Sequence, residues 1–124
     1  MMEKIRVLIA EDDALIGLLL GEMLESMNYD VCAIVDTEVD AVKAAARCEP
    51  QLMIVDQSLA EGDGLHAVET ICGVRPVAHV FVSGDVRRLR SRAPDAIIVQ
   101  KPYRTAELVR AIAAALATPT PAAA

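Results

Sequence analysis

Five short apolar segments recur along the chain, and polar residues bound each of them. They cover residues 5–10, 31–35, 52–55, 77–82 and 96–100. The first is nearly all apolar, which is typical of a strand that is covered on both faces. These segments are predicted to be five strands of one buried sheet.

Segments with the periodicity of helices follow the strands. The apolar positions of the first recur at helical intervals, at Leu15, Leu18, Leu19, Met23 and Met27. Helices are predicted at residues 14–27, 38–47, 65–72, 85–93 and 106–116. Thr37, with Asp40 three residues later, and Thr105 are expected to cap their helices. The fourth helix is short because Pro94 follows it closely.

Strict alternation of strands and helices favours a parallel sheet with helices on both faces. Right-handed crossovers then give an α/β, doubly wound, five-stranded parallel sheet with the flavodoxin-like order 2-1-3-4-5. Residues 3–117 are expected to form this domain. Residues 118–124 are rich in Pro and Ala, and they are expected to form a flexible tail.

The composition fits one globular domain and argues against some functions. The 124 residues are 54% hydrophobic and 24% charged, with a formal net charge of -6. An acidic chain whose aromatic residues are Tyr29, Phe81 and Tyr103 lacks the basic face and stacking groups of a nucleic-acid binder. The sequence shows no signal-peptide pattern and no apolar stretch of membrane-spanning length, so a cytoplasmic location is expected.

The chain has three cysteines, Cys32, Cys48 and Cys72, and their spacing is not that of a metal site. Their number is odd and no signal peptide precedes them. They are therefore expected to be reduced thiols, buried as small apolar residues.

Acidic residues follow two of the predicted strands. Glu11, Asp12 and Asp13 come directly after the first strand, and Asp56 follows the third. In the order 2-1-3-4-5 these strands are neighbours, so their acids converge at the carboxyl edge of the sheet, where ligands bind in such folds. Like charges this close raise each other's pKa unless a cation neutralises them. Oxygen ligands at this density suit Mg²⁺, which is the predicted cofactor.

The fourth and fifth strands end in groups that suit phosphoryl transfer. Ser83 follows the fourth strand and Lys101 the fifth. A carboxylate can act as the nucleophile, while a metal and an ammonium group neutralise charge on the transferring group. Lys101 precedes Pro102, and a cis bond there would turn the lysine back into the pocket.

Together these motifs resemble the receiver (CheY-like) domain of two-component response regulators. The resemblance covers about residues 3–117 and rests on five motifs in order and at near-standard spacing. These are Glu11-Asp12-Asp13, Asp56, Asp63-Gly64, Ser83-Gly84 and Lys101-Pro102.

The resemblance implies a Mg²⁺-dependent phosphorelay. Asp56 would accept a phosphoryl group from a histidine kinase or a histidine phosphotransferase. Asp12 would ligate Mg²⁺ directly and Glu11 through water, with Asp13 at the edge of the site. Asp56 and the main-chain carbonyl of Ser58 would complete the protein ligands.

The resemblance also implies how the signal is read. Ser83 would bind the phosphoryl oxygens and move on activation, and Lys101 would pair with Asp56 and then with the phosphate. The chain would be a signalling domain rather than an enzyme, with at most self-catalysed phosphotransfer and autodephosphorylation. Its expected partners are the phosphodonor and a downstream protein, without direct DNA binding or membrane association, and it would be a monomer or weak dimer.

Some positions depart from the family pattern. Ile98 stands where many receivers have an aromatic switch residue, and Ala60 where many have proline. The segment from Ser83 to Lys101 is short, which trims the fourth helix. These features, with Tyr103 after Lys101-Pro102, resemble an atypical, single-domain receiver branch of alphaproteobacterial stress and light signalling.

Other functions fit less well. A haloacid-dehalogenase-type phosphatase would place two acids two residues apart after the first strand and needs a cap domain, and a flavodoxin needs a neutral phosphate loop there. A degenerate receiver that docks proteins without phosphorylation stays open as the alternative, although it would normally have lost Asp56 or Lys101.

The basic run at residues 87–92 also has two interpretations. Its four arginines form either a solvated helix face or a docking surface for an acidic partner. No functional role is expected for His66 or His79.

Overall fold

The structure, a computed structural model that describes residues 3–118, confirms the predicted α/β fold. Five parallel strands form one sheet in the order β2-β1-β3-β4-β5. The strands are β1 (Arg6–Ala10), β2 (Asp30–Val35), β3 (Leu52–Asp56), β4 (Ala78–Ser83) and β5 (Ile98–Gln100). The helices are α1 (Ala14–Ser26), α2 (Glu38–Cys48), α3 (Gly64–Val74), α4 (Val86–Arg92) and α5 (Thr105–Ala117). Most of the predicted tail, residues 119–124, lies outside the described residues.

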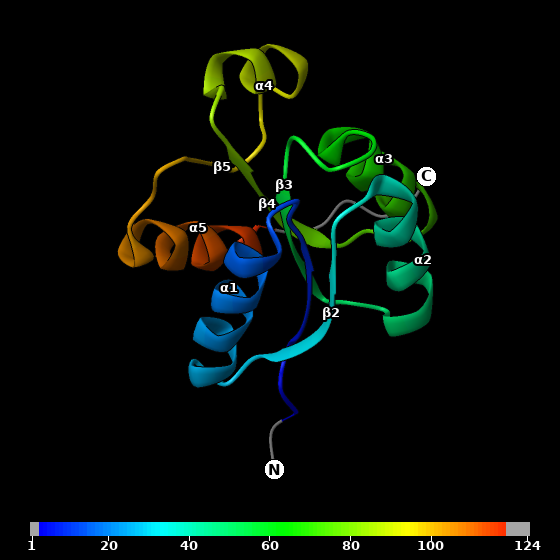
Figure 1. Ribbon diagram of the computed structural model, residues 1–124, viewed down its shortest axis with the longest axis vertical. Coiled ribbons are helices and arrows are strands. Elements are labelled where there is room, and N and C mark those ends of the chain that lie inside the picture. The colour runs from blue at the N-terminus through cyan, green and yellow to red at the C-terminus, as the bar shows by residue number, and fades with distance from the viewer. Residues whose placement is uncertain (1–2, 119–124) are drawn as a thin grey trace.

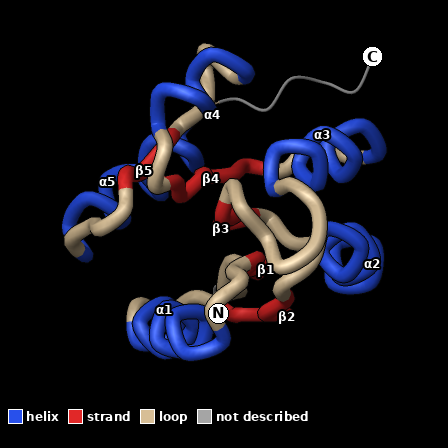
Figure 2. Tube along the Cα trace, turned by 45° about the horizontal axis from the view of Figure 1, so that its top comes forward, coloured by secondary structure: helices blue, strands red, loops and turns tan. Residues whose placement is uncertain are grey.

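The helices cover the two faces of the sheet as separate layers (Figure 1). Helices α1 and α5 pack on one face and α2 and α3 on the other, as Figure 2 shows from a second direction. Alternate residues of β1 enter the two layers: Val7 and Ile9 pack with the α1/α5 layer, and Leu8 and Ala10 with the α2/α3 layer. Because both faces are covered, β1 and β3 are almost wholly buried, which explains their continuous apolar runs.

Some predicted element ends are wrong by a few residues. The last strand, β5, has only three residues, because the main-chain amide of Ala96 still closes a turn to Ala93. Helix α4 has seven residues, and Leu89 is its one fully buried side chain among the described residues. Thr105 is the first residue of α5 and not its cap. The N-cap is Arg104, whose main-chain amide donates to Oε1 of Glu107 at 3.1 Å.

Helix α1 buries a different set of residues from most of the apolar positions that predicted the helix. Its buried residues are Gly17, Leu20, Gly21 and Leu24. A Cβ added at either glycine would lie 3.0–3.1 Å from the side chain of Ile34, so the absence of a side chain lets the helix approach β2 closely. The leucines that indicated the helix are instead largely exposed on its outer face, namely Leu15, Leu18 and Leu19.

Helix α2 is joined to the loop between β3 and α3. Thr37 caps the helix as predicted, accepting a hydrogen bond from the amide of Asp40 at 3.1 Å. The carboxylate of Glu38 accepts from the amide of Asp63 at 2.9 Å and also pairs with His66. The Asp63 hydrogen bond and then His66 lower the pKa of Glu38, while Glu38 raises the pKa of His66. Helices α2 and α3 are therefore held together next to the carboxyl edge of the sheet.

The cysteines are less buried than expected. Cys32, Cys48 and Cys72 are free thiols, and each is only half-buried. The expectation of full burial was wrong, because Cys32 lies on the edge strand β2 and the other two lie on helices at the surface of the α2/α3 layer. Among the described residues, no helix combines the length and the apolar character needed to span a membrane.

Two glycines of α3 give a matched test of how closely the start of this helix approaches the end of β3. A Cβ at Gly64 would lie 2.1 Å from the main-chain oxygen of Asp56, whereas a Cβ at Gly73 meets no atom within 4 Å. We expect Gly64→Ala to lower the free energy of unfolding by about 1–3 kcal/mol or more, because the loop has to move. Gly73→Ala should raise it by about 0.5–1 kcal/mol, since alanine favours the helix. Urea unfolding followed by circular dichroism measures both, and equal effects would contradict the close approach.

Candidate functional site

Three carboxylates meet at the carboxyl edge of the sheet. Glu11 follows β1, Asp12 comes next, and Asp56 is the last residue of β3. One oxygen atom from each lies within 4.8 Å of the others. Glu11 and Asp56 are buried, with exposed fractions of 5% and 4%, while Asp12 is exposed. The order of the strands thus brings together acids that are 44 or more positions apart in the sequence.

Lys101 is the cation of this group. Its Nζ lies 2.5 Å from Oδ2 of Asp56 and 3.6 Å from Oε1 of Glu11. The other oxygen of Asp56, Oδ1, accepts a hydrogen bond from the amide of Ser58 at 3.1 Å. The Lys101–Pro102 peptide bond is cis. Asp56 is therefore held between an ammonium group and a main-chain amide, with both oxygens engaged.

The charges at this edge do not balance without a further cation. Burial, and then the negative charge of Asp56, raise the pKa of Glu11 to about 7. Burial lowers the pKa of Lys101, but the hydrogen bond and charge of Asp56, with Glu11 and Asp12, outweigh it, so that pKa is raised overall. One ammonium group thus faces three carboxylates.

This donor set fits a hard divalent cation such as Mg²⁺. The candidate ligand atoms are carboxylate oxygens, which Mg²⁺ prefers. Because Asp12 is exposed, there is room for the water molecules that a bound Mg²⁺ ion usually keeps. Asp13 is not part of the group: its Oδ1 accepts from the amides of Leu15 and Ile16 at 3.0 and 3.1 Å and caps α1.

Ser83 is close to the acids in the sheet but is held by another residue. It is the last residue of β4 and is 1% exposed. Its hydroxyl donates to Oε1 of Gln57 at 2.5 Å and accepts from the amide of Asp85 at 2.9 Å. Gln57, the residue after Asp56, was missed from the sequence, because nothing in an isolated glutamine signals a buried hydrogen-bond acceptor.

Tyr103 is a second residue that the sequence did not assign to the site. It is half-buried and packs against the α1/α5 layer. Burial, and then the negative charge of Glu11, raise its pKa. Its position two residues after Lys101 is the available signal. Ile98, which occupies the usual aromatic position of the family, packs instead against the α2/α3 layer.

The loop after Asp56 is fixed by the Asp63-Gly64 motif. The amide of Gly64 donates to the main-chain oxygen of Gln57 at 2.8 Å. Asp63 caps α3 by accepting from the amide of Leu65 at 2.9 Å, and it also pairs with Arg92 at 2.7 Å. The motif therefore closes the loop over the end of β3 and links it to α4.

The arginines of α4 do not act as one surface. Arg92 pairs with Asp63, and Nη1 of Arg90 donates to the main-chain oxygens of Pro94 and Ala96 at 3.2 and 2.5 Å. Arg88 lines a hollow of about 260 Å³ together with residues of the β3–α3 loop, among them Ser58. Two of the four arginines thus have structural partners.

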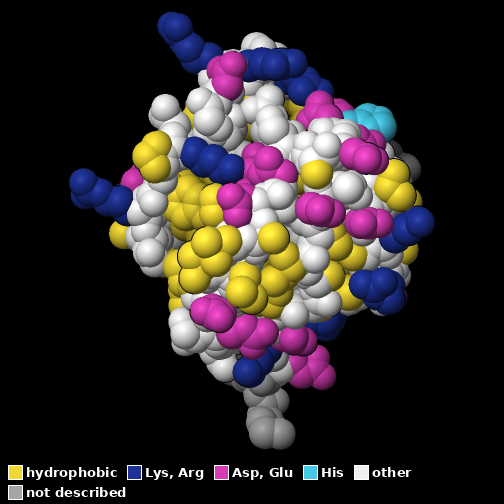
Figure 3. Space-filling model, in the orientation of Figure 1, with side chains coloured by type: hydrophobic (Ala, Val, Ile, Leu, Met, Phe, Trp, Pro, Cys, Tyr) yellow, Lys and Arg dark blue, Asp and Glu magenta, His cyan; other side chains and the backbone are white. Residues whose placement is uncertain are grey.

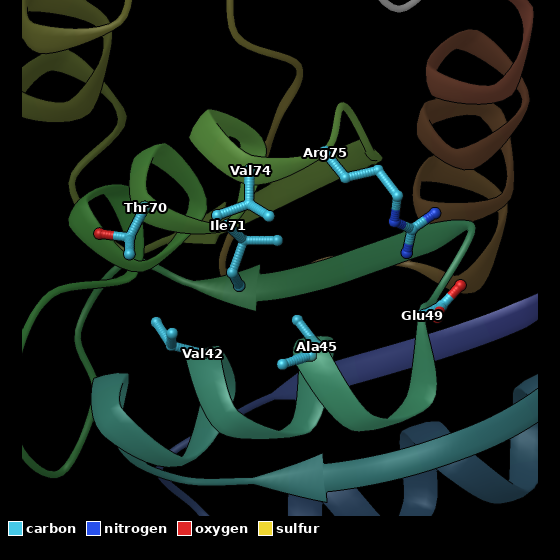
Figure 4. Close-up of a pocket in the computed structure, with 8 residues that line it drawn as sticks. Val42, Ala45, Glu49, Thr70, Ile71, Val74 and Arg75 are labelled. Atoms are coloured by element: carbon cyan, nitrogen blue, oxygen red, sulfur yellow. The ribbon is translucent and has the colours of Figure 1, made fainter. Parts of the chain in front are cut away.

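A larger apolar groove lies away from the acids, between α2 and α3. Figure 4 shows Val42 and Ala45 of α2 facing Ile71 and Val74 of α3. Its volume is about 440 Å³, and small alanine side chains on α2 leave it open. None of its lining residues belongs to the acidic group, so this groove is not part of the candidate site.

Comparison with known proteins agrees with this geometry. Residues 7–113 match the family described as the response regulator receiver domain. The transcriptional regulatory protein PdtaR of Mycobacterium tuberculosis H37Rv is 36% identical over 112 residues, which are 86% of this chain and 54% of PdtaR. The chain thus spans about half the length of this relative.

Solved structures of receiver domains have the same fold. The solution structure of the PhyR response regulator REC domain of Erythrobacter litoralis has a TM-score of 0.87 and 31% identity, covering 97% of this chain and 98% of that one. The anti-anti-sigma factor PhyR of Bartonella quintana has a TM-score of 0.77 and 26% identity, covering 93% of this chain and 48% of that one. A third similar structure is described as the PhyR stress response regulator. This description agrees with the resemblance of the sequence to receivers of stress signalling.

The hydrogen bond between Ser83 and Gln57 predicts energetic coupling. Gln57→Leu keeps the volume but leaves the buried hydroxyl without its acceptor, so we expect a loss of about 1–3 kcal/mol in the free energy of unfolding. Ser83→Ala in the same background should restore part of that loss. A double-mutant cycle by urea unfolding measures the coupling, with Ser91→Ala on the exposed face of α4 as the control partner. Strict additivity of Gln57→Leu and Ser83→Ala would contradict the bond.

Proposed function

We propose that this chain, which belongs to the response regulator receiver domain family, accepts a phosphoryl group on Asp56 in a two-component phosphorelay. The observation that carries the proposal is the buried carboxylate of Asp56, held by Lys101 beside the acidic residues Glu11 and Asp12. Receiver domains are signalling domains, and this one is proposed to switch between two states rather than to turn over a substrate.

The arrangement of charges supports the following transfer step. A carboxylate oxygen of Asp56 attacks the phosphorus of a phosphohistidine on the donor protein, the P–N bond breaks, and the imidazole leaves with the bonding electron pair. Bound at Glu11, Asp12 and Asp56, with the main-chain carbonyl of Ser58, Mg²⁺ would supply neutralisation of the charge on the phosphoryl oxygens. Lys101 neutralises part of the same charge, because its ammonium group already lies against Asp56.

Ser83 and Lys101 are proposed to read the phosphate. Phosphorylation adds a charge of about -1.5 to -2 at neutral pH and three strong acceptors. Lys101 would keep its partner by turning from the carboxylate to the phosphate, and Ser83 would exchange Gln57 for a phosphoryl oxygen. Because Ser83 also accepts from the amide of Asp85, the start of α4 would move with it.

The phosphodonor, a histidine kinase or a histidine phosphotransferase, is proposed to dock on α1. The exposed apolar side chains of this helix lie next to the acids, because α1 begins directly after Asp13. Figure 3 shows hydrophobic side chains gathered on this face with acidic side chains beside them. Such a donor would place the domain in the cytoplasm.

The downstream partner is proposed to be a protein that contacts α4. Arg87 and Arg88 are exposed and have no ion-pair partner among the described residues, and Arg88 faces the hollow beside Ser58. An acidic segment of a partner would complement them. The relatives named above include a transcriptional regulatory protein and an anti-anti-sigma factor, so an output in control of transcription is part of the proposal.

Phosphorylation can be tested directly. Incubation with acetyl phosphate and Mg²⁺ should increase the mass of the protein by one phosphoryl group, and peptide mapping should place that group on Asp56. Asp56→Asn should abolish the adduct, while Asp95→Asn, at an exposed acid away from the site, should leave it unchanged. Lys101→Ala should still accept phosphate but should signal poorly in a reconstituted relay. An adduct that persists in Asp56→Asn would refute the assignment of Asp56 as the acceptor. The absence of an adduct on the wild-type protein would favour a receiver that acts by docking alone.

Metal binding gives a second test. Mg²⁺ relieves the repulsion among the carboxylates, so at ten times its dissociation constant it should stabilise the protein by about 1.4 kcal/mol. Asp12→Asn should remove most of this response, because Asp12 is the proposed direct ligand. Asp13→Asn is the matched comparison: asparagine can still cap α1, so most of the response should remain. A melting temperature that does not respond to Mg²⁺ would argue against the site.

A further inference from the structure

Two cysteines that are far apart in the sequence lie side by side in the fold. Cys32 is in β2 and Cys48 is the last residue of α2. The thiol of Cys48 donates to the main-chain oxygen of Cys32, with 3.4 Å between Sγ and O. The third cysteine, Cys72, has different neighbours, because its thiol lies beside the main-chain oxygen of Val77 and the ring of His79.

An irregularity in the sheet leaves Cys32 without a partner in the ladder between β1 and β2. In the β1–β2 ladder Val7 pairs with Val31 and Leu8 with Ala33, so Cys32 is the extra, unpaired residue of a β-bulge. Val31 packs against the α1/α5 layer and Ala33 against the α2/α3 layer, so the bulge changes which face the strand presents. Bulges commonly re-aim one side chain in this way, and here that residue is Ala33. Cys32, which follows Val31 and so lies on the α2 side of the sheet, contacts the end of α2 through the Cys48 thiol.

The backbone at Cys48 is held in place next to a positive charge. Nε of Arg6 donates to the main-chain oxygens of Cys48 and Glu49 at 3.2 and 3.1 Å. A guanidinium group at the carboxyl end of a helix stabilises that end, so Arg6 fixes the main chain at Cys48. Both cysteines are half-buried and β2 is an edge strand, so a small reagent can reach them.

We propose that Cys32 and Cys48 form a redox-active dithiol, which a low-molecular-weight disulfide such as oxidised glutathione converts to an intramolecular disulfide. Burial, and then the neighbouring Cys48 thiol, raise the pKa of Cys32 to about 12. We assign the first attack to Cys48, whose thiol ends α2 and lies against the main chain of Cys32, and the resolving step to Cys32.

The chemistry balances with the oxidant that is named. The thiolate of Cys48 attacks one sulfur of oxidised glutathione, forming a mixed disulfide and releasing one glutathione thiolate, which takes up the proton lost by Cys48. Cys32 then attacks the Cys48 sulfur, and a second glutathione leaves with the proton of Cys32. Two protein thiols are oxidised, and one glutathione disulfide is reduced to two thiols.

The bond would join β2 to α2 at the edge of the sheet opposite the acids. Cys32 lies near the start of β2, and the carboxyl end of β2 is at the same edge of the sheet as the acids. Helix α2 runs back from that edge and ends with Cys48 near the opposite, amino edge. The pair therefore stands apart from Asp56. Its oxidation does not depend on the proposed phosphorylation.

Mass spectrometry of the full chain tests the proposal. After treatment with oxidised glutathione and alkylation of free thiols by iodoacetamide, we expect one alkylated residue, Cys72, and a peptide link between Cys32 and Cys48. Dithiothreitol should reverse the link, so that all three cysteines are alkylated. Cys72→Ser should form the same link.

Single substitutions in the pair provide the controls. Cys48→Ser should give no link, and Cys32→Ser should stop at glutathione attached to Cys48. The proposal is overturned if the wild-type protein keeps three alkylatable thiols, if it retains glutathione on Cys48 with Cys32 free, or if it forms only links between molecules.

Discussion

Repulsion among three carboxylates at one edge of the sheet is the constraint on which the site depends. Glu11, Asp12 and Asp56 lie within a few ångströms of one another, and Lys101 supplies one positive charge. The remaining negative charge is tolerated because Asp12 reaches water and because Glu11 holds its proton up to about pH 7. The fold therefore concentrates negative charge at this edge, and a cation bound there would relieve the repulsion.

The main chain keeps these groups in place. The residue after each of three strands donates its amide to the neighbouring strand: Glu11 to Val35 at 2.9 Å, Gln57 to Val82 at 2.9 Å, and Lys101 to Ser83 at 2.9 Å. The side chains at the site therefore start from backbone that is part of the sheet rather than from free loops. Main-chain positions set in this way hold the acids in a fixed arrangement, which would favour the proposed transfer of a phosphoryl group to Asp56.

Features that depend on the order of the strands can be predicted from the sequence. Features that depend on the direction of a side chain cannot. Runs of apolar residues give the strands, and alternation with helices gives their order, which alone brings Asp12 close to Asp56. Gln57 could not be predicted, because its role comes from the rotamer that points it at Ser83. The neighbours Cys32 and Cys48 could not be predicted either, since their contact depends on how the end of α2 packs against the edge strand β2.

Helix α1 has one face that packs into the core and another that forms the proposed docking surface. Its inner stripe uses two glycines and two leucines, and the glycines allow the backbone itself to pack against Ile34. The outer leucines contribute little to the core, because more than half of the surface of Leu15, Leu18 and Leu19 is exposed. Substitution at the outer positions can therefore change the proposed docking surface while the inner positions stay fixed. A duplicated copy of such a domain could acquire a new partner without first losing its stability.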